Sequence, residues 1–155
     1  RSLLSKWFQD RETKVYIISP RLDEERLKDI TDFMTKGNFQ ATLSALIVNP
    51  QCDGPRTVNN IKKSVLAKYS NRHLHPVIEH FVFRNIFYTR KEFQGNFIAG
   101  TKGDQAEILV TSANFHKDSF KCGNFESVFF TRMEENKFIE SYMDPIVPPV
   151  VATMY

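Results

Sequence analysis

FQGNFIAG at residues 93–100 and ILVTSANF at residues 108–115 are the two stretches that decide the predicted fold of this chain. Both have the composition of strands, and the segment between them, residues 101–104, has the composition of a turn. Gly103 in this turn tolerates a positive backbone φ, which tight hairpin turns require. The two stretches therefore predict an antiparallel β-hairpin.

Upstream of the hairpin, strand-like and helix-like runs alternate along the chain. Asp23 has the side chain of a helix N-cap, and Gly37 marks the end of the same helix. Continuous apolar residues at 76–88 fit a buried strand, although parts of this run also fit a helix. Strand and helix in alternation predict a largely parallel sheet. The predicted strands are 14–19, 39–48, 76–88, 92–100, 106–114 and 125–130, and the predicted helices lie around Trp7, at 24–34, from Thr57 onward and at 134–142.

Polar side chains recur on the hairpin and just beyond it. Alternate residues of a strand share a face, so Gln94 and Asn96 point to the same side, as do Ser112 and Asn114 on the partner strand. Glu126 follows on the next predicted strand, where its carboxylate opens an otherwise apolar face and needs a partner. Each residue alone fits a solvated sheet face, but the ordered set predicts a polar pocket near the strand ends.

This ordered set resembles the active-site half of the phospholipase D superfamily, in which a strand bearing His-x-Lys pairs with a strand ending in Ser-x-Asn and an acidic residue follows. The strand at 14–19 and the helix after it resemble the first β-α unit of that family. The resemblance implies an α/β fold: a mixed, largely parallel β-sheet flanked by helices on both faces, with a β-hairpin that carries the motif. We expect residues 1–155 to form one such domain, and a start at Arg1 without methionine suggests a piece of a longer protein.

The residues that perform the family's chemistry are replaced in this chain. Gln94 stands where the family has its nucleophilic histidine, Asn96 where it has a phosphate-binding lysine, and Thr101 where it has an aspartate. An amide nitrogen has no free lone pair, so Gln94 neither attacks phosphorus nor transfers a proton. Asn96 offers dipoles but no cation for the transition state. The resemblance therefore predicts an inactive, vestigial pocket with no cofactor and no metal.

The supporting residues of the family's pocket are retained. Ser112 and Asn114 correspond to residues that hydrogen-bond phosphate or the catalytic side chains, and Glu126 corresponds to the one that orients the partner histidine. His116 and Lys117 follow closely and are candidates for contacts with a phosphate or another ligand. An amide network among these groups satisfies their hydrogen bonds without making the pocket reactive.

Two functions are predicted on this basis. The first is a binding or scaffold module whose partner is nucleic acid, single-stranded or duplex DNA, or a protein, since many relatives are nucleases or DNA-end-processing phosphodiesterases. The alternative is one half of a two-motif phosphodiesterase whose working His-x-Lys is supplied by another half or subunit. A homodimer is also expected from the single-motif relatives, but it would contain two glutamines and no nucleophile.

Composition narrows the remaining possibilities. A net charge of +3 from 21 basic and 18 acidic residues permits an anionic partner without requiring one, and Lys62, Lys63, Lys68, Arg72 and Lys91 are the candidates for a basic cluster. Two distant cysteines favour an intracellular, reducing location, and no apolar run reaches the length of a transmembrane segment. His73 and His75 form a His-x-His pair that is typical of a solvated loop more often than of a metal site.

Overall fold

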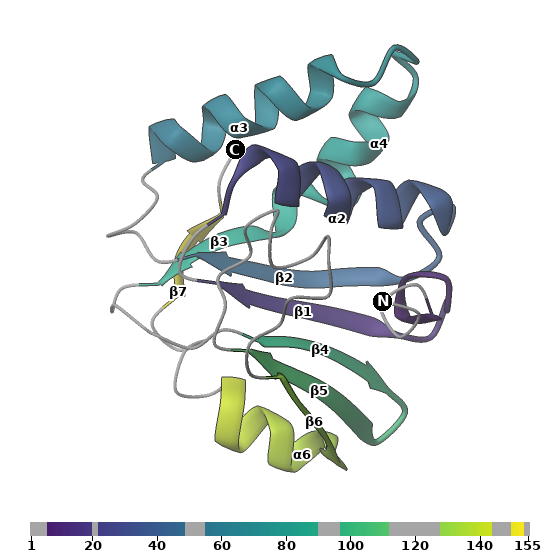
Figure 1. The fold of residues 1–155 in the computed structure, drawn as a ribbon, viewed down its shortest axis with the longest axis vertical. Helices are drawn as coiled ribbons and strands as arrows, with labels where there is room; N and C mark the ends of the chain where they lie inside the picture. The colour runs from purple at the N-terminus through teal and green to yellow at the C-terminus, as the bar shows by residue number, and fades with distance from the viewer. Residues whose placement is uncertain are drawn as a thin grey trace.

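A seven-stranded mixed β-sheet forms the centre of the computed structural model (Figure 1). The structure describes residues 6–19, 22–48, 55–89, 97–111, 128–143 and 150–153. The strand order across the sheet is β6-β5-β4-β1-β2-β3-β7. The strands are β1 (Lys14–Ser19), β2 (Thr42–Val48), β3 (Ile86–Thr89), β4 (Phe97–Lys102), β5 (Gln105–Thr111), β6 (Val128–Glu134) and β7 (Val150–Thr153).

The pairing of these strands corrects one prediction. Strand β2 is parallel to β1 and to β3, as the alternation of strand and helix predicted. The other neighbouring pairs, β1–β4, β4–β5, β5–β6 and β3–β7, are antiparallel. The α/β class is therefore right, but the sheet is mixed and mainly antiparallel. The reason is that β4 runs alongside β1 in the opposite direction, and β5 and β6 each pair antiparallel with the strand before them.

Helix α2 (Glu24–Lys36) begins and ends where its sequence predicts. The Asp23 side chain accepts a hydrogen bond of 2.8 Å from the backbone N–H of Arg26, so Asp23 is the N-cap. At the other end, the N–H of Gly37 bonds to the carbonyl of Phe33. A Cβ at Gly37 would lie 2.2 Å from the carbonyl oxygen of Phe8, which explains a glycine at this contact.

The apolar run at 76–88 contains a helix as well as a strand. Helix α4 (Leu74–Phe81) is followed by the short 3-10 helix η1 (Phe83–Asn85) and only then by β3. Pro76 lies in the first turn of α4, where its missing N–H costs no helical hydrogen bond. The strand prediction is therefore wrong for the first part of this run and right for its end.

The predicted hairpin is present as β4 and β5, paired from Phe97 with Val110 to Lys102 with Gln105. Gly103 in the turn has a φ of 61°, the left-handed conformation for which glycine was expected. The carbonyl of Asp104 in the same turn accepts a 2.7 Å hydrogen bond from the N–H of Glu135. The turn thus also anchors the start of the last helix.

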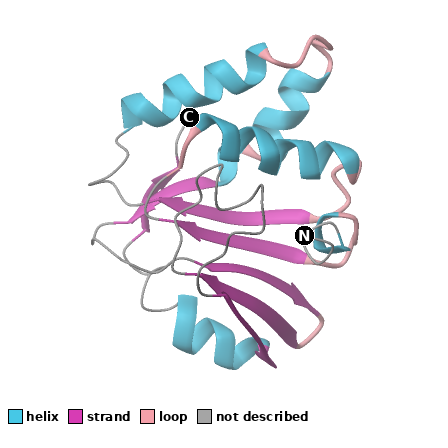
Figure 2. Ribbon diagram, viewed as in Figure 1, coloured by secondary structure: helices cyan, strands magenta, loops and turns pink. Residues whose placement is uncertain are grey.

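Helices cover both faces of the sheet, as predicted (Figures 1 and 2). Helices α2, α3 (Pro55–Ala67) and α4 lie on one face, over a core that includes Val15, Ile17 and Leu46. Helix α6 (Glu135–Phe138) and the π-helical turn η2 (Ile139–Met143) lie on the other, where Phe138 and Met143 pack against residues such as Ile18 and Ile108. All helices in the described ranges are too short or too polar to cross a lipid bilayer.

Candidate functional site

The strand ends that flank the predicted motif meet at one edge of the sheet. Phe97 at the start of β4 pairs with Val110 near the end of β5, and Thr111 pairs with Val128 at the start of β6. On the other side of β4, Phe97 pairs with Ile18 near the end of β1. The parallel strands β1, β2 and β3 have their carboxyl ends at this edge, and ligand sites of parallel sheets usually lie at the carboxyl ends of the strands. The described ends at this edge are Ser19, Val48, Thr89, Phe97, Thr111, Val128 and Val150.

The predicted pocket residues themselves lie outside the described residues. These are Gln94, Asn96, Ser112, Asn114, Glu126, His116 and Lys117. The face assignments made for the hairpin can be checked on its described part. Phe97 and Ala99 face one core together with Ile108, whereas Ile98 and Leu109 face the other. The predicted alternation therefore holds for Phe97–Ala99 of β4 and for Ile108 and Leu109 of β5.

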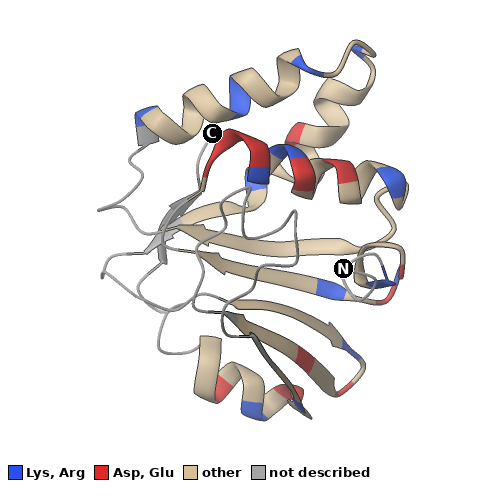
Figure 3. Ribbon diagram, in the orientation of Figure 1, with Lys and Arg blue, Asp and Glu red and all other residues tan. Residues whose placement is uncertain are grey.

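The net positive charge of the chain is concentrated in one segment of the fold. Residues 55–89 hold six Lys or Arg and one Glu, whereas the rest of the chain holds 15 basic and 17 acidic residues. This segment includes α3, which has no acidic residue, and α4 (Figure 3). The surplus of cations is thus already contiguous in the sequence, and the fold places this segment in the helical layer formed by α3, α4 and the residues that join and follow them.

Part of that layer is neutralised by α2. The Nζ of Lys68 lies 2.6 Å from a carboxylate oxygen of Glu24, and its hydrogen bond lowers the pKa of that carboxyl. The Tyr69 hydroxyl donates to Asp32, which also accepts from Lys28 on its own helix. The acidic face of α2 therefore compensates the C-terminal end of α3.

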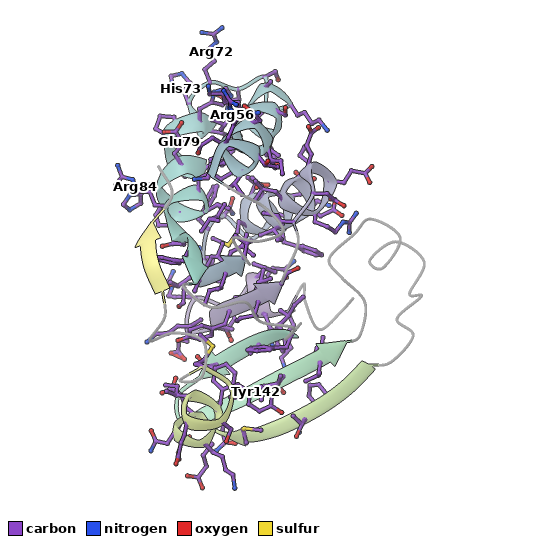
Figure 4. The ribbon with its side chains drawn as sticks, turned by 90° about the vertical axis from the view of Figure 1, so that its left-hand side faces the viewer. Arg56, Arg72, His73, Glu79, Arg84 and Tyr142 are labelled. Atoms are coloured by element: carbon purple, nitrogen blue, oxygen red, sulfur yellow. The ribbon has the colours of Figure 1, made fainter. Side chains whose placement is uncertain are left out.

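The remaining cations of the layer are exposed. Arg56, Lys63, Arg72 and Arg84 have exposed side chains, and none of them forms an ion pair with another residue in the described ranges. Figure 4 shows Arg72 at the top of the molecule, Glu79 and Arg84 along its left side, and Arg56 near the start of α3. Of the five lysines and arginines proposed as a cluster, Lys62, Lys63 and Arg72 belong to this layer, Lys68 is paired, and Lys91 lies outside the described residues.

A cavity of about 530 Å³ opens between α3 and the α4–η1 segment. Most of its polar lining residues are cationic. Two of them, Lys62 and Lys63, were candidates for a basic cluster in the sequence, which gave no sign of the cavity itself. Lys62 is only 7% exposed, and burial lowers its pKa to about 8 although Glu79 opposes this shift. The lining residues are Asn59, Lys62, Lys63, Leu66, Glu79, Phe83 and Arg84.

A second cavity, of about 410 Å³, lies beside the hairpin and is bordered by charges that already pair with one another. Lys102 bonds to Asp10 at 2.8 Å, and Arg132 bonds to Glu107 at 3.0 Å. The indole of Trp7 donates to Glu107 as well. These mutual contacts support a structural role for this region.

The two histidines of the His-x-His pair are separated by the start of α4. His73 is exposed at the N-cap, whereas the Nε2 of His75 lies 2.8 Å from the carbonyl oxygen of Tyr69. Within the described ranges, no three His, Cys, Asp or Glu side chains are grouped as a metal site requires.

No protein-family model matches the chain, and a search of curated proteins gives no match either. The sheet edge, the cationic helical layer and the α3–α4 cavity are the features of the described residues that bear on function.

Proposed function

We propose that this chain is a catalytically inactive phospholipase D-like domain that binds nucleic acid without cleaving it. Two kinds of observation support the proposal. The motif residues are sequence neighbours of strand ends that meet at one edge of an α/β sheet. The chain also carries an exposed cationic layer that suits a polyanionic partner.

The proposed inactivity follows from the side chains at the motif positions. Asn96 directly precedes Phe97 and Ser112 directly follows Thr111, at two neighbouring ends of the hairpin. A pocket at this edge would be lined by the amides of Gln94 and Asn96 and would contain no nucleophile from this chain. Loss of a nucleophile lowers hydrolysis rates by factors on the order of 10⁶.

The single observation that carries the choice of partner is the charge of the α3–α4 layer. Four exposed cations without ion pairs to other described residues are available for phosphate contacts. Phosphate contacts release counterions, so affinity falls steeply with salt, by a slope of about 0.9 per contact on duplex DNA and about 0.7 on single strands. A partner recognised mainly through apolar contacts would show no such slope.

The test combines a binding assay and a turnover assay on the same preparation. Fluorescence anisotropy with single-stranded and duplex DNA over a salt series should show salt-sensitive binding, and a chromogenic phosphodiester should not be hydrolysed. The variant Arg56→Gln, Lys63→Gln, Arg84→Gln should weaken binding and reduce the salt slope by about 2 or more. Its matched control, Lys14→Gln, Lys36→Gln, Lys137→Gln, removes three exposed lysines elsewhere and should retain most of the slope.

Two outcomes would contradict the proposal. Hydrolysis by the unmodified chain would disprove inactivity, and its loss on mutation of His116 would identify the residue responsible. Binding that is absent or insensitive to salt would point to a protein partner instead. The double variant Gln94→His, Asn96→Lys measures how much of the pocket remains, because partial hydrolysis requires the supporting residues to be in place.

A further inference from the structure

An aromatic side chain is exposed at the C-terminal end of α4. Phe81 is 40% exposed, and its ring contacts two others. The centroids of Phe81 and Phe39 are 5.5 Å apart with 31° between the ring planes, and the imidazole of His80 stands perpendicular to the Phe81 ring at 4.8 Å. His80 is exposed as well, whereas Phe39 is half-buried. These three residues, here called the Phe81 surface, form a continuous aromatic area that is open to solvent.

The backbone holds Phe39 in a conformation that is unfavourable for its residue type. Asn38 and Phe39 follow the end of α2 with φ angles of 52° and 56°. Asparagine tolerates this left-handed region, but a bulky aromatic residue rarely adopts it. The N–H of Phe39 donates a 2.8 Å hydrogen bond to the carbonyl of Met34, which fixes the strained turn. Strain of this kind is concentrated at functional sites, and here it accompanies the contact between Phe39 and Phe81.

A cation lies next to the Phe81 surface along the chain. Arg84 follows Phe81 by three residues, and Val82 between them keeps a right-handed helical backbone, so the two side chains occupy neighbouring positions. Arg84 is exposed and forms no ion pair with another described residue (Figure 4). The segment around it, residues 55–89, holds six Lys or Arg and one Glu. An aromatic area beside an available guanidinium in a cationic segment suits a ligand that is both aromatic and anionic.

The other strongly exposed phenylalanine of the described residues has a different setting. Phe130 on β6 is 46% exposed, but the guanidinium of Arg132 lies 5.4 Å from the centroid of its ring. Arg132 in turn is bound to Glu107. At Phe130 the ring and the cation are thus engaged with each other and with a carboxylate, whereas Phe81 has only aromatic contacts and Arg84 has no anionic partner among the described residues.

We infer that the Phe81 surface is a stacking site for an unpaired base of a single-stranded nucleic acid, and that Arg84 contacts a phosphate of the same strand. Every base has a π face, so stacking on aromatic side chains binds single strands with little regard to sequence. A guanidinium binds phosphate through two parallel hydrogen bonds. The inference rests on the proposed nucleic-acid binding and deepens it, because bases within a duplex are already stacked on one another and are not available to such a site.

The experiment uses the intact chain with two probes of equal length, an oligothymidylate of about ten nucleotides and its abasic counterpart, which retains every phosphate but has no bases. Fluorescence anisotropy over a salt series measures the affinity for each. Phe81→Leu removes the ring and keeps an apolar side chain, and Phe130→Leu makes the same change at the matched exposed site on β6. Phe81→Trp retains a ring at the site. Thermal unfolding verifies that all variants are folded.

We expect the oligothymidylate to bind more tightly than the abasic strand by about fivefold or more, as one stacked base contributes. Phe81→Leu should abolish this preference and leave the salt slope unchanged, because the phosphate contacts remain. Phe81→Trp and Phe130→Leu should keep both. Arg84→Gln should weaken binding of the two probes alike and reduce the slope by about 0.7.

A second measurement detects stacking directly. With one base of the oligonucleotide replaced by 2-aminopurine, whose fluorescence falls when it stacks on an aromatic ring, binding to the unmodified chain and to Phe130→Leu should quench the signal. Binding to Phe81→Leu should leave the signal unquenched at saturation.

The inference is overturned if the unmodified chain binds both probes equally, or if Phe81→Leu, although folded, keeps the preference for bases or the quenching. Such a result would leave the nucleic-acid proposal intact as long as both probes bind with a salt slope. If neither probe binds, the proposed function fails and this inference fails with it.

Discussion

The indole Nε1 of Trp7 donates a 2.9 Å hydrogen bond to Oε1 of Glu107, which joins two residues 100 positions apart. The other oxygen of Glu107 accepts a 3.0 Å bond from Nε of Arg132 on β6. Trp7 itself is 2% exposed and packs in the core beneath α2. One carboxylate thus connects the N-terminal helical turn with the two strands β5 and β6.

The Trp7 ring lies directly over Gly100, so a larger residue there should destabilise the protein. A Cβ at Gly100 would lie 2.7–2.9 Å from three carbon atoms of the indole. Gly100→Ala should therefore lower the free energy of unfolding by about 1–3 kcal/mol, as overpacking of a core does. Urea unfolding followed by tryptophan fluorescence measures the change.

Gly103 provides a contrasting control in the same hairpin. A Cβ there meets nothing within 4 Å, but its φ of 61° disfavours most side chains. Asparagine tolerates this conformation, so Gly103→Asn should cost less than Gly100→Ala. Equal losses at both positions would show that contact with Trp7 is not the cause.

Trp7→Phe should make the stability of the protein less dependent on pH in the acid range. The hydrogen bond from Trp7, followed by that from Arg132, holds the pKa of Glu107 below its ordinary value of 4.5. A carboxyl with a lowered pKa stabilises the fold above about 4.5 and loses this contribution as pH falls through the folded-state pKa. The difference in stability between the two proteins should therefore be larger near pH 7 than near pH 3.

The measurement is chemical denaturation at both pH values, with the loss near pH 7 expected at about 2 kcal/mol. NMR titration of Glu107 should show its pKa rising in the variant. In a Glu107→Gln background, the effect of Trp7→Phe should no longer change with pH, and a change that persisted there would assign it to another group.

Lys62→Met should stabilise the unliganded protein near neutral pH. The native pKa of about 8 is below the ordinary 10.5, so the native state binds fewer protons than the unfolded state between these values. The charged Lys62 therefore costs stability in full below about pH 8, and this cost diminishes as pH rises toward 10.5. We expect a gain of about 1–3 kcal/mol at pH 7 that disappears near pH 10.5.

Denaturant midpoints across this range test the prediction, with Lys63→Met as the control because Lys63 is exposed on the same helix. A loss of stability in Lys62→Met would mean that the ammonium is well compensated in the fold.

Asp23→Ala should lower stability by about 1 kcal/mol, because the N–H of Arg26 loses its 2.8 Å acceptor at the start of α2. Asp23→Asn keeps an acceptor oxygen and should cost less. Thermal unfolding of both variants distinguishes the two. Equal losses would attribute the effect to the negative charge of Asp23 and not to its hydrogen bond.

Local signals made part of this fold predictable. Asp23 and Gly37 delimit α2, and Gly103 marks the hairpin turn, because caps and positive φ angles depend on the residue itself and its near neighbours. The strand at 14–19 was also correct, since Pro20 follows its last residue. These features need no knowledge of distant contacts.

Features set by distant contacts were not predictable in this way. The position of β4 beside β1 makes the sheet mainly antiparallel, and the four-residue strand β7 is defined by its pairing with β3. Helix α4 was obscured because an apolar run fits either a buried strand or a helix. The cavity beside Lys62 likewise arises only when α3 and α4 are brought together.

The central place of β1 in the sheet bears on how this chain is synthesised. The unit from β1 through α2 to β2 forms between near neighbours in sequence, so it can assemble soon after leaving the ribosome. The other hydrogen-bonding edge of β1 stays unpaired until β4 is synthesised, because the residues of β4 are translated much later. During that interval an apolar strand edge is open to other nascent chains, and slowing translation beyond residue 89 should increase its demand for chaperones.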